Sequence, residues 1–328
     1  MKIKIAAILI LFSYNAFSFT PDYNEIPSAE DIPIIDGHLH LFRDVDADHV
    51  REKFKEFNVV KAVWFPRGFG SRGSKGIQKG KDLDFAKSNP DLGYVLAGLQ
   101  KKFLHKEKFG TSNWTDPHKK WKPWLRDAQS KVLNGDFAGY GELIIRHYSY
   151  NQGKGERDYP IDSVVFTDLL RASNESKKPF VIHAEGEDHI VKDLLEQLPK
   201  YPNAKVIWAH ACGRSNPTLV HQWLLKNPNL YCDLANMTDT GHYGSLWPRH
   251  GEWTYRFEKN GEILPDWLTV VEALPSRFYI GSDVNEGVGW DKLVWQERII
   301  RFRKLLAQLS PNAREWLAWK TVETLYSD

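Results

Sequence analysis

Two histidines separated by one residue close an apolar run near the start of the sequence. His38 and His40 belong to the segment IIDGHLHLF, residues 34–42. Alternate side chains of a β-strand point to the same face, so this pair can bind one ion. Imidazole nitrogens suit Zn²⁺ and similar divalent metals. Asp36 shares that face, and we expect it to brace the strand from the layer below. An isolated H-x-H pair is weak evidence, so the rest of the chain must complete a site.

Further polar side chains stand within or at the ends of later apolar runs. Glu142 lies in YGELI, His183 ends FVIH, His210 ends VIWAH and Asp283 ends YIGSD. Each alone has an ordinary explanation, such as a packed histidine, a helix-capping Asp or a Glu that pairs with Arg146. The ordered set outweighs these explanations, because unrelated strands rarely all end in metal-binding or acid–base groups by chance.

Eight short apolar runs separated by longer stretches indicate parallel βα units. The runs are residues 34–40, 59–65, 93–99, 139–145, 179–184, 205–210, 229–234 and 277–282, and helical stretches cover residues 46–56, 161–174, 190–197 and 218–226. Pro160 and Pro217 stand just before two of these helical stretches. The regular count of eight predicts an α/β fold, a (β/α)8 TIM barrel with long strand-to-helix loops, rather than a doubly wound sheet.

Three connectors after predicted strands are unusually long: residues 66–81, 101–135 and 237–264. Barrel active sites are built from such loops, and aromatic side chains suit a partly covered substrate pocket. Trp114, Trp121 and Trp124 lie in the second connector, although each one alone is more simply structural. Residues 68–73 match G-x-G-x-x-G, but no helix begins there, so no dinucleotide site is expected.

The first 18 residues have the pattern of a signal peptide. Lys2 and Lys4 precede an apolar stretch at residues 5–12, and Ala16-Phe17-Ser18 gives a small-x-small cleavage pattern. The stretch is too short to span a bilayer, and no cysteine near it could carry a lipid. We therefore expect an exported protein, periplasmic or secreted, with no stable membrane anchor. Residues 19–33 would form an N-terminal extension and residues 34–328 one TIM-barrel domain.

The composition is that of a globular protein, with 42% apolar and 26% charged residues. Lys2 and Lys4 account for the whole formal net charge of +2, so the mature chain is neutral and nothing indicates a nucleic-acid partner. The two cysteines, Cys212 and Cys232, exclude a disulfide scaffold but leave open one bridge or two buried thiols. A homodimer also stays open.

The motifs IDGHLH, YGEL, VIHAEG, IWAHACG and IGSD, in this order, resemble those of the amidohydrolase superfamily, in the branch that includes aminocarboxymuconate-semialdehyde decarboxylase. The resemblance runs from residue 34 to residue 325. It implies that one divalent ion, most often Zn²⁺, is bound by His38, His40, His183 and Asp283, and that His210 polarises the attacked group or orients water. Where relatives bind two metals, a fourth-strand side chain bridges them, so Glu142 and His210 are candidates for a second site. Cys212 departs from the family pattern, and so does the segment Thr321-Val-Glu-Thr-Leu-Tyr326, which stands where relatives often have an Asn-Ala pair.

This resemblance is specific for the superfamily rather than for one reaction. A protein-bound Zn²⁺ can lower the pKa of its water to about 7, and we expect Asp283 to accept that proton and return it to the leaving group. The expected reaction is hydrolysis of an amide, ester or lactone in a small-molecule substrate. Arg67, Arg146 and Arg214 are candidates to hold a substrate carboxylate. A metal-dependent decarboxylase and a non-catalytic exported binding protein are the alternatives.

Overall fold

The computed structural model describes residues 32–42, 45–66, 80–100, 104, 112–147, 156–238, 255–284 and 294–327. The expected signal peptide, most of the N-terminal extension and most of the first and third long connectors lie outside these ranges. Arg67 lies outside them as well.

All eight predicted strands are present. They are β1 (Ile34–Leu41), β2 (Val59–Pro66), β3 (Gly93–Val95) with β4 (Ala97–Gly98), β5 (Tyr140–Ile144), β8 (Pro179–His183), β9 (Lys205–Trp208), β10 (Leu230–Asp233) and β13 (Phe278–Tyr279). The third predicted strand is divided in two at Leu96. Two short antiparallel pairs are added, β6 (Arg146–His147) with β7 (Arg157–Asp158) and β11 (Glu258–Lys259) with β12 (Glu262–Ile263).

The main strands are parallel and form two sheets, in the orders β1-β2-β3 and β13-β10-β9-β8-β5-β4. Backbone hydrogen bonds connect the sheets at both sides. The Leu96 amide donates to the Trp64 carbonyl, and the Gly37 amide donates to the Ile280 carbonyl. The α/β class is thus confirmed. The assigned strands of the described residues do not make one closed sheet, so the closed barrel stays a prediction.

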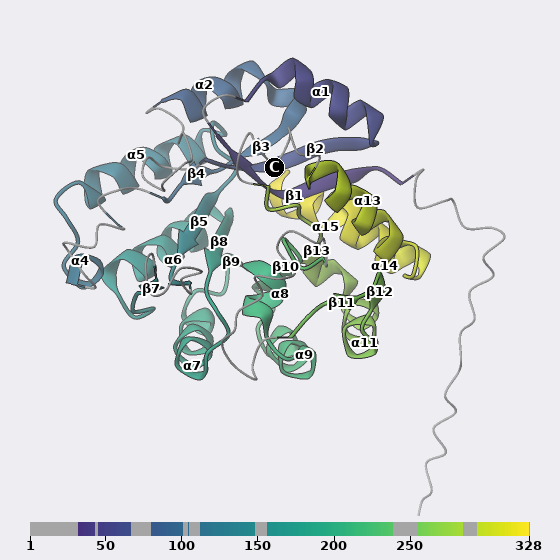
Figure 1. Ribbon diagram of the computed structural model, residues 1–328. Helices are drawn as coiled ribbons and strands as arrows, with labels where there is room; N and C mark the ends of the chain where they lie inside the picture. Colours follow the sequence, from purple (N-terminus) through teal and green to yellow (C-terminus); the bar gives the residue numbers. More distant parts are fainter. Residues whose placement is uncertain are drawn as a thin grey trace, which may run out of the picture.

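Helices surround the strands (Figure 1). Four match predicted stretches: α1 (Ala47–Glu56), α6 (Val164–Ser176), α7 (Asp188–Gln197) and α9 (Pro217–Lys226). The others are α2 (Lys81–Ser88), α4 (Ser112–Thr115), α5 (Trp121–Leu133), α8 (Ala209–Arg214), α11 (Pro265–Ala273), α13 (Val294–Leu306), α14 (Pro311–Glu315) and α15 (Thr321–Tyr326), with short turns η1 (Pro90–Leu92), η3 (Leu198–Lys200), η4 (Pro275–Arg277) and η5 (Trp316–Lys320). None of the helices in the described ranges is both long and apolar enough to cross a membrane.

Capping residues explain where the predicted helices begin. The Asp46 side chain accepts from two backbone amides of the first turn of α1. Pro217 occupies the first turn of α9, as predicted, after an Asn216 cap. Helix α6 begins later than residue 161, because the Ser163 hydroxyl accepts from the Phe166 amide and fixes the first turn there.

The second long connector folds against the core through its tryptophans. Trp114 is fully buried and stacks on Tyr159 with ring centroids 4.2 Å apart. Trp121 begins α5, is also fully buried, and donates through Nε1 to Asp168. Trp124 stacks on Trp121. Packing explains these three side chains, so the structural interpretation holds for them.

An apolar cluster fills the space between the strands. Its members come from the strands and from α15: Ile35, Val63, Phe65, Leu96, Val181, Ile207, Tyr279, Val322, Leu325 and Tyr326. Asp36 braces β1 as expected, because its carboxylate accepts from the Ser282 amide and from Trp295 Nε1. The ends of the strands that carry the polar side chains are therefore held on a packed base.

Candidate metal centre

The six side chains expected to form the site come together at the carboxyl ends of the strands. His38 and His40 lie on β1 and Glu142 on β5, His183 ends β8, and His210 and Asp283 follow β9 and β13. The four histidines and Glu142 are buried, and the Asp283 side chain is 15% exposed. Parallel strands place such residues at one edge, which is where sites of this fold class are built.

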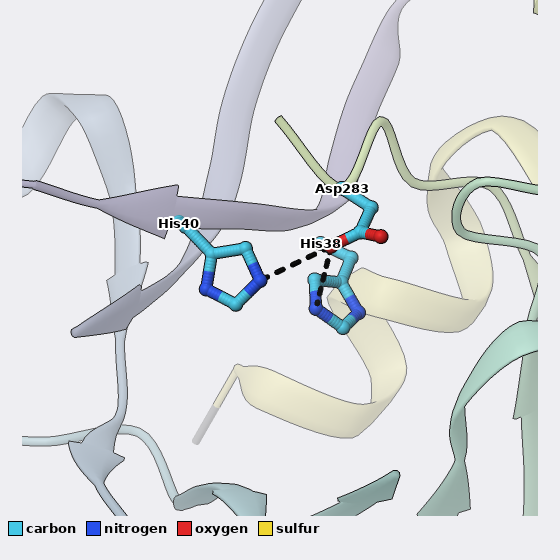
Figure 2. Close-up of side chains that lie close together, drawn as sticks. All are labelled: His38, His40 and Asp283. Atoms are coloured by element: carbon cyan, nitrogen blue, oxygen red, sulfur yellow. Dashed lines mark hydrogen bonds and ion pairs between the residues drawn. The ribbon is translucent and has the colours of Figure 1, made fainter. Parts of the chain in front are cut away.

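The first three ligand candidates are His38, His40 and Asp283. Figure 2 shows both rings, carried by β1, next to the Asp283 carboxylate. His40 Nε2 lies 3.1 Å and His38 Nε2 lies 3.8 Å from Asp283 Oδ1. Two ligand atoms that share a zinc ion, each about 2.0–2.2 Å from it, lie no more than about 4.4 Å apart. These separations therefore fit a shared cation.

Glu142, His183 and His210 form a second group of three. His183 Nδ1 lies 3.0 Å from Glu142 Oε1 and 3.0 Å from His210 Nε2. Glu142 also faces the first group, because its Oε1 is 4.0 Å from His38 Nε2. The carboxylate of Glu142 therefore lies between the two groups, as a bridging or proton-transfer residue would.

The partner of each ring identifies the nitrogen that points into the centre. His38 Nδ1 is 2.9 Å from Asp233 Oδ2, and a carboxylate only accepts, so Nδ1 carries the proton. His38 Nε2 is buried without a hydrogen-bond partner in the described structure. A buried ring nitrogen of this kind, with a carboxylate behind the ring, is the arrangement of metal-binding histidines. The residues present thus fit a divalent cation.

His210 is oriented in the same way. Its Nδ1 lies 2.8 Å from the Ala235 carbonyl oxygen, which only accepts, so neutral His210 has its lone pair on Nε2. Burial, and then the charges of Arg214 and His183, lower the pKa of His210 to about 4. The ring is therefore neutral at ordinary pH, and its Nε2, which lies 3.0 Å from His183 Nδ1, can bind a cation or accept a hydrogen bond.

His210 sits on an uncommon stretch of backbone. His210, Ala211, Cys212, Gly213 and Arg214 all have positive φ, between 53° and 72°, although only one of them is glycine. Left-handed conformation costs a non-glycine residue about 1–2 kcal/mol. Neighbouring contacts hold the turn: the Cys212–Cys232 disulfide, and the Gly186 amide, which donates to the Gly213 carbonyl. The bridge that the sequence left open is thus present.

The centre attracts positive charge. Burial lowers the pKa of His38, but the charge and hydrogen bond of Asp233 outweigh burial and raise it to about 10. Burial also lowers the pKa of His183, but the hydrogen bond and charge of Glu142 are the main effects that outweigh it and raise this pKa to about 9. Burial alone would raise the pKa of Asp283, but histidine contacts hold it well below its usual range. Anionic carboxylates among histidines are what a divalent cation requires.

Comparisons with known proteins identify the fold. No protein-family model and no curated protein matches the sequence. Among solved structures, the chain is similar to an amidohydrolase from Burkholderia multivorans with bound HEPES, with a TM-score of 0.52 and 12% identity, over 90% of this chain and 99% of that one. It is similar to a 2,6-dihydroxybenzoate decarboxylase complexed with 2,6-dihydroxybenzoate, with a TM-score of 0.51 and 9% identity, over 90% and 99% of the two chains. It is also similar to the 5-carboxyvanillate decarboxylase of Novosphingobium aromaticivorans complexed with manganese and 4-hydroxy-3-methoxy-5-nitrobenzoic acid, with a TM-score of 0.51 and 10% identity, over 92% and 98%.

The chain has the amidohydrolase fold. The resemblance inferred from the motifs is thereby confirmed for the fold, which spans nine-tenths of the chain. The identities of 9–12% leave the reaction to be argued from the site itself.

The two predicted substrate-binding arginines that are described have carboxylate partners within the amidohydrolase fold. Arg214 donates to both oxygens of Glu185 at 2.7 Å, in a fully buried pair. Arg146 donates to Glu187 and to Glu156, each at 2.6 Å. Their role toward a substrate carboxylate stays a prediction, and these partners are not predictable from the sequence.

Asp233 is the site residue that sequence reasoning missed. It ends β10 and is fully buried, and its carboxylate contacts His38. Its signal was present, because a polar side chain at the end of an apolar run is the feature that identified His183 and Asp283.

Proposed function

We propose that this chain is a member of the amidohydrolase superfamily that uses a divalent metal to hydrolyse an amide, ester or lactone of a small molecule. The observation that carries this proposal is the convergence of four histidines, Glu142 and Asp283, with His38 Nε2 buried among them and without a hydrogen-bond partner in the described part of the chain. A site that had lost its function would be expected to have lost some of these groups.

One divalent ion, which we propose to be Zn²⁺, would be held by His38, His40 and Asp283, with His183 as the fourth ligand. The group of Glu142, His183 and His210 is where a second ion would bind. A bound divalent cation supplies Lewis acidity, which lowers the pKa of water and polarises a carbonyl oxygen.

Asp283 is the proposed proton acceptor. Its carboxylate is ionised, because histidine contacts hold its pKa well below the usual range. Its side chain is also the most exposed of the six. The Asp283 carboxylate would take a proton from water and pass it to the leaving nitrogen or oxygen. His210 Nε2, with its lone pair, would accept a hydrogen bond from that water.

Decarboxylation is the second candidate, and two of the similar structures favour it, because they are decarboxylases. A departing carboxylate would be held best by a free cation. The buried Arg214–Glu185 pair and the paired Arg146 argue for the hydrolase.

The experiment tests both reactions on one preparation. The purified chain, loaded with Zn²⁺ or Mn²⁺, is assayed for proton release from amides, esters and lactones and for CO₂ release from hydroxybenzoates. Hydrolysis that is lost in Asp283→Asn and kept in Asp168→Asn, a buried aspartate paired with Lys122 and Trp121, supports the proposal. CO₂ release without hydrolysis identifies a decarboxylase. A wild-type chain that binds no metal and shows neither reaction would contradict the proposal and favour the alternative of a non-catalytic binding protein.

Export is a further part of the proposal. Disulfides persist in oxidising compartments, so the Cys212–Cys232 bridge supports an exported protein with residues 1–18 removed. N-terminal sequencing of the protein recovered from the periplasm or medium should begin near Phe19. Recovery of the chain with Met1 from the cytoplasm would contradict this.

A further inference from the structure

Three N–H groups converge on one buried carboxylate at the end of β10. Asp233 Oδ2 accepts from His38 Nδ1 at 2.9 Å. Asp233 Oδ1 accepts from the backbone amides of His210 at 2.8 Å and of Ala235 at 3.1 Å. Asp233 is fully buried, so no water competes for these bonds. One side chain thus connects the first strand, the turn after β9 and its own loop.

The loop that Asp233 fixes acts on a second ring of the centre. The bond from the Ala235 amide to Asp233 shapes residues 233–235 as a tight turn. The Ala235 carbonyl then accepts the Nδ1 proton of His210 at 2.8 Å. The ring protons of both His38 and His210 are therefore placed by this one turn, and the two Nε2 atoms face the centre.

The preceding residue fixes the same turn by a covalent bond. Cys232 is bonded to Cys212, two residues after His210, and both cysteines are fully buried. Cys212 lies inside the left-handed stretch, where four residues other than glycine have positive φ. The disulfide, together with the hydrogen bond from the His210 amide, attaches this strained stretch to two adjacent residues of β10, Cys232 and Asp233.

We propose that Cys232 and Asp233 form a positioning element for the metal centre. Asp233 determines which nitrogen of His38 and His210 faces the ion, and the disulfide holds the turn that delivers His210. This inference rests on the proposed metal-dependent function, but its consequences for the ring protons and for the turn do not require turnover.

Asp233→Asn is the sharpest substitution, because it changes one atom without changing the size of the side chain. Asparagine has one accepting oxygen and one donating amide, whereas all three neighbours of Asp233 donate. Whichever way the amide points, it faces either His38 Nδ1–H or the two backbone N–H groups. We expect the Kd for Zn²⁺ to rise about 10–100-fold, the range for partners that orient metal-binding residues. Asp168→Asn, also buried, should leave the Kd within twofold.

The spectroscopic readout is the ring proton itself. In wild-type protein with ¹⁵N-labelled histidine, His38 and His210 should each show an Nδ1 proton protected from exchange with solvent. In Asp233→Asn, the His38 Nδ1 proton should lose that protection, and the His210 amide should exchange faster. A merely structural loss of stability, as in Asp168→Asn, would not move these signals.

The disulfide is tested with Cys212→Ser combined with Cys232→Ser, which leaves no thiol that could bind Zn²⁺. At a temperature where the variant is folded, we expect faster exchange of the His210 amide and a Kd for Zn²⁺ raised about tenfold. Cysteine variants with wild-type exchange and wild-type Kd would overturn the role of the disulfide.

Two results would overturn the role of Asp233. One is a wild-type His38 or His210 whose Nδ1 carries no proton, a measurement that does not depend on whether Asp233→Asn folds. The other is an Asp233→Asn chain with wild-type Kd and wild-type ring signals. If wild type binds no metal, the proposed function fails, and the ring protons and amide exchange still decide whether Asp233 positions the two histidines.

Discussion

The two nitrogens of His38 meet different surroundings, and that difference gives the residue its proposed role. Nδ1 is bonded to the Asp233 carboxylate, and Nε2 is buried without a partner in the described structure, near Asp283. A buried ring nitrogen left unpaired is costly unless something binds it. A proton or a metal ion can do so, and the two therefore compete for this position.

This competition predicts how metal binding depends on pH. The pKa values of His38 and His183 are raised to about 10 and about 9, so both rings hold an extra proton at neutral pH. An ion must displace these protons, so its affinity should rise with pH and fall as the medium becomes acidic. With two protons released, the Kd would change by up to about 100-fold per pH unit between pH 6 and 8.

Calorimetric titration with Zn²⁺ in buffers of different ionisation enthalpy counts the protons released. We expect more than one proton per ion at pH 7. An affinity that is the same at pH 6 and pH 8, with no proton released, would show that these histidines do not bind the ion.

Residue types and positions predicted most of this site, since His183, His210 and Asp283 each follow an apolar run in the sequence. The hydrogen-bond partners of these residues could not be predicted from the sequence. Asp233 reaches His38 across 195 positions, and nothing local to either residue records that contact. The Glu185 partner of Arg214 is hidden for the same reason.

At the scale of single elements, the turn after β9 is the least ordinary part of the fold. Five consecutive residues, 210–214, have positive φ in a stretch that contains one glycine. The sequence AHACGR does not indicate such a turn, because Ala and Cys rarely adopt it. The strands, in contrast, were predictable, since each is an apolar run between polar connectors. Helix α5 was missed as part of a long connector, although Trp121, Leu125, Ala128 and Val132 show helical spacing.

Gly213 should be the most sensitive position of this turn. Its φ is +72°, and a Cβ there would lie 2.6 Å from the Ala184 carbonyl oxygen. Gly213→Ala should therefore lower the free energy of unfolding by about 3 kcal/mol or more, combining the left-handed cost with overpacking. Urea denaturation measures this loss.

Gly135 is the matched control, with a φ of +77° and open space around its Cα. Gly135→Ala should cost only about 1–2 kcal/mol, the conformational part alone. Equal losses in the two variants would mean that close packing around the turn contributes nothing.

On the scale of the whole molecule, the described site is built by long-range contacts between successive strand ends, held on an apolar base. The strand order and the fold were predictable from the count of runs and from the motifs. The closed barrel stays a prediction, because the assigned strands fall into two sheets, which only a few backbone hydrogen bonds connect on either side. The start of helix α6 was also predicted inexactly, because Ser163 rather than Pro160 determines where the helix begins.

The disulfide should contribute to global stability as well as to the turn. It closes a loop with a sequence separation of 20 residues, for which chain entropy gives about 3 kcal/mol. Wild-type protein should therefore lose about this much stability in denaturant when a reductant is present throughout unfolding. The variant with serine at both positions should respond to denaturant identically with and without reductant. A wild-type unfolding transition that is the same with and without reductant would contradict the presence of the disulfide.

Metal content is the most direct test of the central claim that the six converging side chains form a metal centre. Elemental analysis of the purified, oxidised wild-type chain, dialysed against Zn²⁺-free buffer after loading, should give one divalent ion per chain. The variant His38→Ala, prepared and dialysed in parallel, should retain less than a tenth of that amount. A wild-type chain without bound metal, or a His38→Ala chain that retains as much as wild type, would contradict the account.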